Sequence, residues 1–433
     1  MCLKSPIPVP KLSEAISFIQ DALDEGVFPE LQGDCTGGTY FCFDKYGDME
    51  AVFKPFDEEP YCVNNPKGLG PSAFSSEMDR GVVPGTGGLR EVAACFLDRD
   101  HFVGVPETTL VSFLFSNCNE TKIQDYGCRR KEGSLQLFVP HECSSEDYGP
   151  AMFNIANVQS IAIFDMRLLN LDRHANNLLV TRQRLRAVSH CDDLFPVNES
   201  RASSSRRSMS IYSAPRAMGL VLVPIDHGYS LPAYRTCVRP EWCWRGWYQS
   251  KVTIEENVKE YVREIDIEED VKLLKSNIPQ LDEQAVVTLR ITTAWLKLCV
   301  EANQTIEAMS SFFFPKEDGS SAFQDVANLY SISSYASFND FLQAEVLADA
   351  LQGVSGTECC RGILLFQRLF QVPEAVVLQK FQSKAADEVC TGQTLHHALV
   401  IAANGCIYLF QRHFYTSPKN SFVKENSFFR GGG

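Results

Sequence analysis

The chain has 433 residues, 45% of them apolar, and is long enough to bury a sizeable hydrophobic core. Its formal net charge of −14 at pH 7 argues against nucleic-acid binding, which requires clustered basic residues. There is neither a signal-peptide pattern nor an apolar run of the roughly 18 residues that span a bilayer, so we expect a cytoplasmic protein. The sixteen cysteines include no C-x-x-C pair, and we expect them to be free thiols.

The first predicted elements are a helix and a β-hairpin. Leu12–Leu23 has the apolar spacing of an amphipathic helix. A glycine pair then leads into a short strand, a polar turn, and a returning strand at Met49–Lys54. Because glycine permits close backbone approach, the amides before the first strand are candidates for binding phosphate, with an ordinary hairpin entry as the alternative. These candidate amides belong to Gly37, Gly38 and Thr39.

A lysine and a glutamate follow in an order that suggests an ion pair. Lys54 ends the returning strand, and Glu91 lies in Leu89–Asp98, where apolar residues recur at helical spacing. A kinase holds the nucleotide phosphates with a lysine that a glutamate keeps in place. We therefore predict a Lys54–Glu91 ion pair, against the alternative of two solvated charges. Thr108–Leu114 and Leu135–Val139 are predicted as further strands.

Two motifs in the second half of the chain carry the chemistry. Residues 165–180 read D-M-R-L-L-N-L-D-R-H-A-N-N-L-L-V at the end of a predicted buried helix, and residues 223–229 read V-P-I-D-H-G-Y. Phosphoryl transfer needs one carboxylate to orient the attacking hydroxyl, and an amide with a second carboxylate to hold Mg²⁺. We predict Asp172 as the catalytic residue and Asn177 and Asp226 as metal ligands. The alternative is that all three serve only in turns.

The remaining organisation follows from composition. A polar Ser/Arg stretch at residues 183–217 is predicted to be a disordered insertion in a hairpin that joins Val180 to Gly219. Helices are expected over residues 254–276 and 282–304. Residues 314–433 contain helical patterns but no motif, so we treat them as a helical extension of unknown role.

Aromatic and basic residues crowd the segment after Asp226. Tryptophan favours the lipid–water interface, and each basic residue adds about 1 kcal/mol at an anionic surface. We expect this segment to contact a membrane or the substrate, with burial of the tryptophans in the core as the alternative. Its members are Arg235, Arg239, Trp242, Trp244, Arg245 and Trp247.

The chain resembles the catalytic domain of the phosphatidylinositol 3-/4-kinases, most of all the plant gamma-type phosphatidylinositol 4-kinases. The matching blocks, in order, include V-F-K-P-F-D-E-E-P (52–60), L-R-E-V-A-A (89–94), D-R-H-A-N-N (172–177) and P-I-D-H-G-Y-S-L-P (224–232). The resemblance implies an α+β, two-lobed protein-kinase-like fold. A β-rich N-lobe would occupy residues 1–140 and a mainly helical C-lobe residues 141–313.

The resemblance also implies an activity. It is ATP-dependent phosphorylation of phosphatidylinositol at the 4-position of the inositol ring, with Mg²⁺ or Mn²⁺, at an anionic membrane to which the protein binds peripherally. A protein Ser/Thr kinase and a nucleotide-binding scaffold remain open alternatives. His174 would stabilise charge on the transferring phosphoryl group or support the loop, and Asn176 stands where the family usually has glycine. The hinge that meets adenine would be Phe138, Val139, Pro140 and His141.

Overall fold

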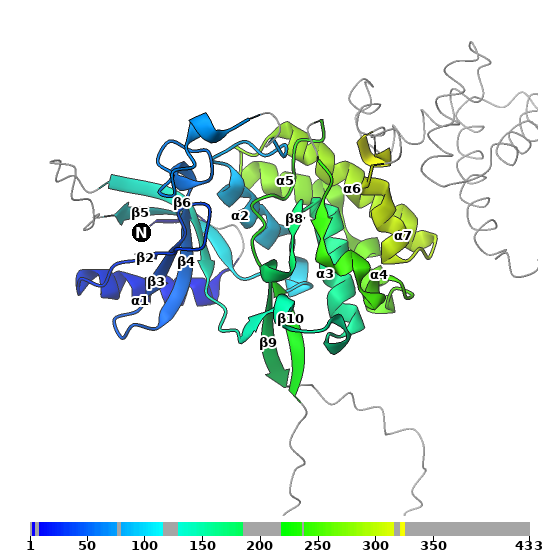
Figure 1. Cartoon of the computed structure of the whole chain (residues 1–433), viewed down its shortest axis with the longest axis horizontal. Coiled ribbons are helices and arrows are strands. Elements are labelled where there is room, and N and C mark those ends of the chain that lie inside the picture. The colour runs from blue at the N-terminus through cyan, green and yellow to red at the C-terminus, as the bar shows by residue number, and fades with distance from the viewer. Residues whose placement is uncertain are drawn as a thin grey trace, which may run out of the picture.

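The computed structural model describes residues 2–4, 8–75, 79–115, 129–184, 218–235, 238–315 and 321–324. Within these ranges the chain forms two lobes, a sheet-rich N-lobe (blue to cyan) and a mainly helical C-lobe (green to yellow) (Figure 1). The predicted two-lobed α+β fold is therefore confirmed. Most of the predicted insertion at 183–217 and of the extension at 314–433 lies outside the described residues.

The N-lobe is built on a six-stranded antiparallel sheet with the strand order β1-β5-β6-β4-β3-β2. Helix α1 (Pro10–Asp24) places Leu12, Ile16 and Ile19 in one apolar cluster with Phe53 of the sheet, as its amphipathic pattern predicts. The strands are β1 (Cys2–Lys4), β2 (Glu30–Leu31), β3 (Tyr40–Phe43), β4 (Met49–Pro55), β5 (Thr108–Phe115) and β6 (Arg129–Leu137).

The C-lobe combines five helices with short strands that carry the site. Strands β9 and β10 form the antiparallel hairpin predicted on either side of the insertion, and β7 adds to its edge. Strands β8 and β11 pair in parallel. The elements described are α3 (Ile155–Leu168), α4 (Glu256–Glu264), α5 (Ile267–Asn277), α6 (Glu283–Glu301), α7 (Ile306–Ser310), β7 (Cys143–Ser144), β8 (Asp172–Arg173), β9 (Leu178–Arg184), β10 (Met218–Pro224) and β11 (Glu241–Trp242).

One helix prediction needs correction. The helix expected over residues 254–276 is two helices, α4 and α5, which meet at Ile265 and Asp266. The Asp266 carboxylate accepts hydrogen bonds from the backbone N–H groups of Glu268 and Glu269, which makes it the N-cap of α5. The apolar spacing continues through this point, so it does not reveal that the Asp266 cap begins a new helix.

Helix α2 (Gly87–Leu97) belongs to both lobes. Its buried Val92 and Phe96 share one hydrophobic core with Phe164 of α3 and Leu289 of α6, while Glu91 faces the end of β4 in the N-lobe. The helix that carries Glu91 is thus packed against the N-lobe strands β5 and β6 as well as against the C-lobe helices. No helix in the described ranges is long and apolar enough to cross a membrane.

Candidate active site

The loop between α3 and β9 holds Asp172 and Asn177 in fixed positions. The Asn170 side-chain oxygen accepts a hydrogen bond from the Asp172 N–H (3.0 Å), and the Asn177 side-chain amide donates to the Asp172 carbonyl (2.8 Å). These two bonds orient the loop from both ends. They also use the nitrogen of the Asn177 amide, which leaves its oxygen for a cation.

A buried arginine connects this loop to the segment that carries Asp226. The Arg173 guanidinium donates to the Asp165 carboxylate (3.0 Å), to the carbonyl of Asn177 (2.7 Å) and to the carbonyl of Ile225. It also lies 3.0 Å from Nε2 of His227, and burial and this positive charge lower the pKa of His227 well below 6.5. Arg173 therefore fixes the spacing between the two candidate metal ligands.

The predicted ion pair between Lys54 and Glu91 is present. Nζ of Lys54 lies 2.7 Å from a carboxylate oxygen of Glu91 and 3.3 Å from one of Asp226. The second Glu91 oxygen accepts a hydrogen bond from the His227 N–H (2.9 Å). Asp226 has a left-handed backbone (φ 56°), and its side chain is 46% exposed. One cation thus joins the end of β4, helix α2 and the loop after β10.

The charges in this cluster follow from competing effects. Burial alone would lower the pKa of Lys54, but the carboxylates of Asp226 and Glu91 outweigh it, and the pKa is raised. The ammonium of Lys54 lowers the pKa of Asp226 to about 2, while burial raises the pKa of Glu91. At neutral pH the cluster therefore presents an ammonium group and the ionised carboxylate of Asp226.

The residues present fit a magnesium ion that is shared with a nucleotide. Mg²⁺ in such sites takes one or two protein oxygens and completes its shell with phosphates and water. The exposed carboxylate of Asp226 and the amide oxygen of Asn177 supply two. The described residues contain no cluster of three or more His, Cys, Asp or Glu side chains for a metal held by protein alone.

Gly38, predicted to bind phosphate through its backbone amide, has a structural role in the glycine turn. The Gly38 N–H donates to the Glu58 carbonyl (2.9 Å), and a Cβ on Gly38 would lie 2.6 Å from Cβ of Glu58. Glycine is thus required here by close packing against Glu58, and its amide is already engaged. Thr39 is buried, and its carbonyl accepts the N–H of Gln32 (2.8 Å).

The predicted hinge follows the last N-lobe strand directly. The Phe138 N–H donates to the Glu50 carbonyl (2.9 Å), and the Phe138 ring packs edge-on against Phe41 (6.1 Å). Nδ1 of His141 lies 2.7 Å from the Val139 carbonyl. The hinge therefore begins as a continuation of the sheet and bends at its exposed end, Pro140 and His141.

His174 and Asn176 occupy a single turn of 3-10 helix and its start. His174 is partly buried, and its carbonyl accepts the N–H of Asn177 (3.1 Å). Asn176 is exposed, has no positive φ, and accepts a hydrogen bond from the Ser144 hydroxyl (2.8 Å). The backbone at this position thus does not need glycine, and the side chain gains a partner on strand β7.

The prediction that Trp242 and Trp244 contact a membrane is wrong. Both are buried, 6% and 0% exposed, and their rings stack at 4.9 Å. Their indole N–H groups donate to the Asn170 carbonyl (2.6 Å) and to the Asp165 carboxylate (2.9 Å). Each apolar ring fills the core, while the indole N–H of Trp242 reaches the loop before Asp172 and that of Trp244 reaches helix α3. Trp247 is partly buried and stacks on Phe153 (5.6 Å).

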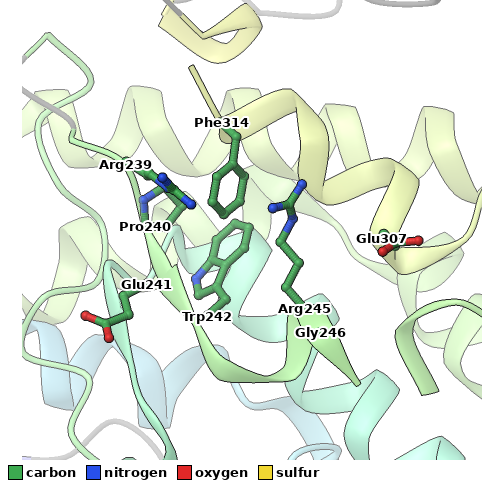
Figure 2. Close-up of a pocket in the computed structure, with 8 residues that line it drawn as sticks. All are labelled: Arg239, Pro240, Glu241, Trp242, Arg245, Gly246, Glu307 and Phe314. Atoms are coloured by element: carbon green, nitrogen blue, oxygen red, sulfur yellow. The ribbon is translucent and has the colours of Figure 1, made fainter. Parts of the chain in front are cut away.

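The arginines of the same segment lie differently. Figure 2 shows Arg239 and Arg245 on either side of the Phe314 ring, with guanidinium carbons 5.1 and 4.0 Å from its centroid. They line a cavity of about 650 Å³ whose wall includes Trp242. Arg245 also donates to the Ser310 hydroxyl (3.0 Å), whereas Arg239 is exposed. Arg235 is exposed outside this cavity and lies over Tyr234.

Comparison with known proteins agrees with this geometry. Residues 36–337 match the family model described as Phosphatidylinositol 3- and 4-kinase. The chain is 35% identical over 316 residues to phosphatidylinositol 4-kinase gamma 4 of Arabidopsis thaliana, which covers 70% of this chain and 49% of that protein. It is 35% identical over 307 residues to phosphatidylinositol 4-kinase gamma 4 of Oryza sativa subsp. japonica, covering 68% and 47%. The chain thus spans about half the length of the curated relatives it matches.

Proposed function

Because this chain belongs to the phosphatidylinositol 3- and 4-kinase family, we propose that it transfers the γ-phosphoryl group of ATP to a hydroxyl of phosphatidylinositol. The observation that carries the proposal is the convergence of Lys54, Glu91 and Asp226 beside the loop of Asp172 and Asn177. The 4-position of the ring is proposed from the names of the gamma-type relatives.

Each residue then has a distinct part in the transfer. Lys54, held by Glu91, would bind the nucleotide phosphates, and Asn177 and Asp226 would hold Mg²⁺, which neutralises charge on the phosphates when bound. Asp172 would orient the acceptor hydroxyl and accept its proton. His174 would stabilise charge on the transferring phosphoryl group. Arg173 holds these parts in register without touching the substrate.

The nucleotide base would lie against the hinge. Backbone groups of Phe138–His141 would meet adenine, since this stretch leaves the sheet at the junction of the lobes. Gly37 and Thr39 would lie above the phosphates, while the engaged amide of Gly38 supports the turn through Glu58.

The exposed arginines would bring the protein to an anionic membrane. Arg235 and Arg239 are exposed, and Arg239 and Arg245 add positive charge beside one cavity. Each such residue adds about 1 kcal/mol at an anionic surface. Changing Arg235 and Arg239 to glutamate should reduce co-sedimentation with phosphatidylserine vesicles. Unchanged co-sedimentation of the folded variant would remove this surface from the proposal.

The acceptor is tested by offering two substrates side by side. The full chain with γ-labelled ATP and Mg²⁺ should label vesicles that contain phosphatidylinositol, and should not label phosphatidylcholine vesicles or a generic protein substrate. Separation of the lipids by thin-layer chromatography reads out the product. Label on the protein alone would identify a protein kinase, and nucleotide binding without any labelled product would identify a scaffold.

A further inference from the structure

Arg80 lies on a segment of the N-lobe that crosses to the C-lobe. The segment precedes helix α2, and the Gly81 carbonyl accepts a hydrogen bond from the N–H of Ala233 (2.6 Å) in the stretch that follows Asp226. The Asp79 carboxylate accepts the Gly81 N–H (2.8 Å), and Gly81 has a left-handed backbone (φ 73°). These contacts hold the backbone directly after Arg80.

The Arg80 side chain reaches the catalytic carboxylate. Its Nη1 lies 3.1 Å from Oδ1 of Asp172, and its guanidinium carbon lies 5.0 Å from the centre of the Tyr229 ring. The Arg80 and Asp172 side chains are 41% and 23% exposed, so the pair is partly screened by solvent. Because solvent weakens this ion pair, the Arg80 guanidinium can also bind another anion.

Lys54 and Arg80 thus bind different carboxylates of the site. Lys54 contacts Glu91 and Asp226, which belong to the proposed metal and nucleotide side of the site. Arg80 contacts Asp172, which would face the acceptor hydroxyl, and lies over Tyr229 in the segment beyond Asp226. The position of Arg80 therefore points to the acceptor rather than to ATP.

The charge of the acceptor supplies the reason for a cation here. Phosphatidylinositol carries an anionic phosphodiester on the same ring as its reacting hydroxyl. A ring placed against the carboxylate of Asp172 brings two negative charges together, which is unfavourable unless a cation lies between them. Arginine suits this place because its guanidinium has five N–H donors, so it can keep one bond to Asp172 and offer the others to a phosphate.

We propose that Arg80 binds the phosphodiester of the acceptor lipid and thereby selects alcohols that carry an anionic phosphodiester on the same ring as the reacting hydroxyl. This role rests on the proposed lipid kinase function. Recognition of the acceptor would thus involve an N-lobe residue that lies outside the aromatic and basic segment after Asp226.

The test compares wild type with Arg80→Gln in the full chain. The probes are glycerophosphoinositol and myo-inositol, used as competitive inhibitors of phosphate transfer to a short-chain phosphatidylinositol. Wild type should bind glycerophosphoinositol more tightly than myo-inositol, and Arg80→Gln should reduce that preference by about 10- to 100-fold, as expected for a hydrogen bond to a charged group. The KM for phosphatidylinositol should rise by a similar factor, with the KM for ATP unchanged.

Further variants separate this role from a structural one. Arg80→Lys keeps the charge and should recover part of the preference. Arg263→Gln, which removes an arginine paired with Glu256 on helix α4, should match wild type. An Arg80→Gln variant with an unchanged preference, or with a faster reaction because an inhibitory contact has been removed, would overturn the proposal. A wild type that phosphorylates no phosphatidylinositol would refute the function itself and this role with it.

Discussion

At the scale of single residues, the site depends on how one ammonium group is shared. Lys54 bonds to Glu91, whose side chain is only 3% exposed, and to Asp226, which is 46% exposed. The buried partner fixes the lysine, while the exposed partner remains free to turn towards a cation. The same lysine therefore connects the parts of the site and, in the proposed function, would also contact the nucleotide phosphates.

Changing Lys54 to methionine should cost both stability and nucleotide binding. Its place at a strand end before a proline predicts little effect on folding, but the structure shows that the change leaves the buried Glu91 without its cation. We expect a loss of about 1–3 kcal/mol in the free energy of unfolding. The rise in Tm that Mg²⁺-ATP produces in wild type should disappear. An undiminished rise in the variant would exclude Lys54 from phosphate binding.

The ionisation of Asp226 should make stability depend on pH in acid. Its pKa of about 2 in the folded chain lies below the value near 3.9 of an unfolded aspartate. The carboxylate therefore stabilises the fold above the unfolded pKa, and this contribution is lost as the pH falls from about 4 towards 2. The difference in unfolding free energy between wild type and Asp226→Asn, measured in urea, should shrink across this window. A difference that stays constant from about pH 6 to about pH 2.5 would contradict this prediction.

Sequence motifs predict the charged residues of the site better than the residues that hold them in position. The order of the motifs along the chain is enough to predict the Lys54–Glu91 pair, because kinases use a lysine to bind the nucleotide phosphates and a glutamate to hold that lysine in place. The roles of Arg173 and Trp244 are not visible in that order, since each acts through tertiary contacts with Asp165. A tryptophan beside arginines has the same sequence pattern on a surface as in a core, which is why the sequence alone does not decide between membrane contact and burial for Trp242 and Trp244.

At the scale of elements, helix α2 is held at its start by a carboxylate. Glu59 accepts hydrogen bonds from three backbone N–H groups, those of Gly85, Gly87 and Gly88, at 2.9, 2.9 and 2.8 Å. These donors lie at a helix N-terminus, where backbone amides lack partners and negative charge is favoured. Glu59 therefore positions the helix that presents Glu91.

Replacing Glu59 with glutamine should loosen this helix. The amide nitrogen cannot accept a hydrogen bond, so at least one backbone donor loses its partner, and we expect a loss of about 1–3 kcal/mol in unfolding free energy. Phosphate transfer should fall, and the KM for ATP should rise because Lys54 is held less firmly. Glu260→Gln, at an exposed position on α4, is the matched control. Equal kinetics in the two variants would show that Glu59 does not position the site.

Periodicity predicts most elements, but not where tertiary contacts interrupt them. The helix predicted at Leu12–Leu23 and the strand predicted at Met49–Lys54 match α1 and β4 within two residues at each end. The parallel pairing of β8 with β11 joins residues about seventy positions apart in only two registered pairs, Glu241 with Asp172 and Trp242 with Arg173. Strands of two residues are too short to show an alternating apolar pattern, so their pairing cannot be predicted from the sequence.

At the scale of the whole molecule, the lobes meet along α2 and the site. Helix α2 packs into the C-lobe core, yet its Glu91 binds Lys54 from the N-lobe sheet, and Arg80 reaches Asp172 from the N-lobe side. Ion pairs that bridge the lobes therefore surround the reacting groups. The order of motifs predicts that these residues belong to one site, whereas the bridging contact of Arg80 depends on how the lobes close.

In the proposed function, Asp172 activates the acceptor hydroxyl, whereas Lys54, Asn177 and Asp226 bind the nucleotide and its metal. The most direct test measures labelled phosphatidylinositol phosphate made by wild type and by Asp172→Asn, together with the Tm shift each shows with Mg²⁺-ATP. We predict a rate about 10²- to 10⁴-fold lower in the variant with the Tm shift retained. A variant that forms product within a few-fold of the wild-type rate would contradict the account.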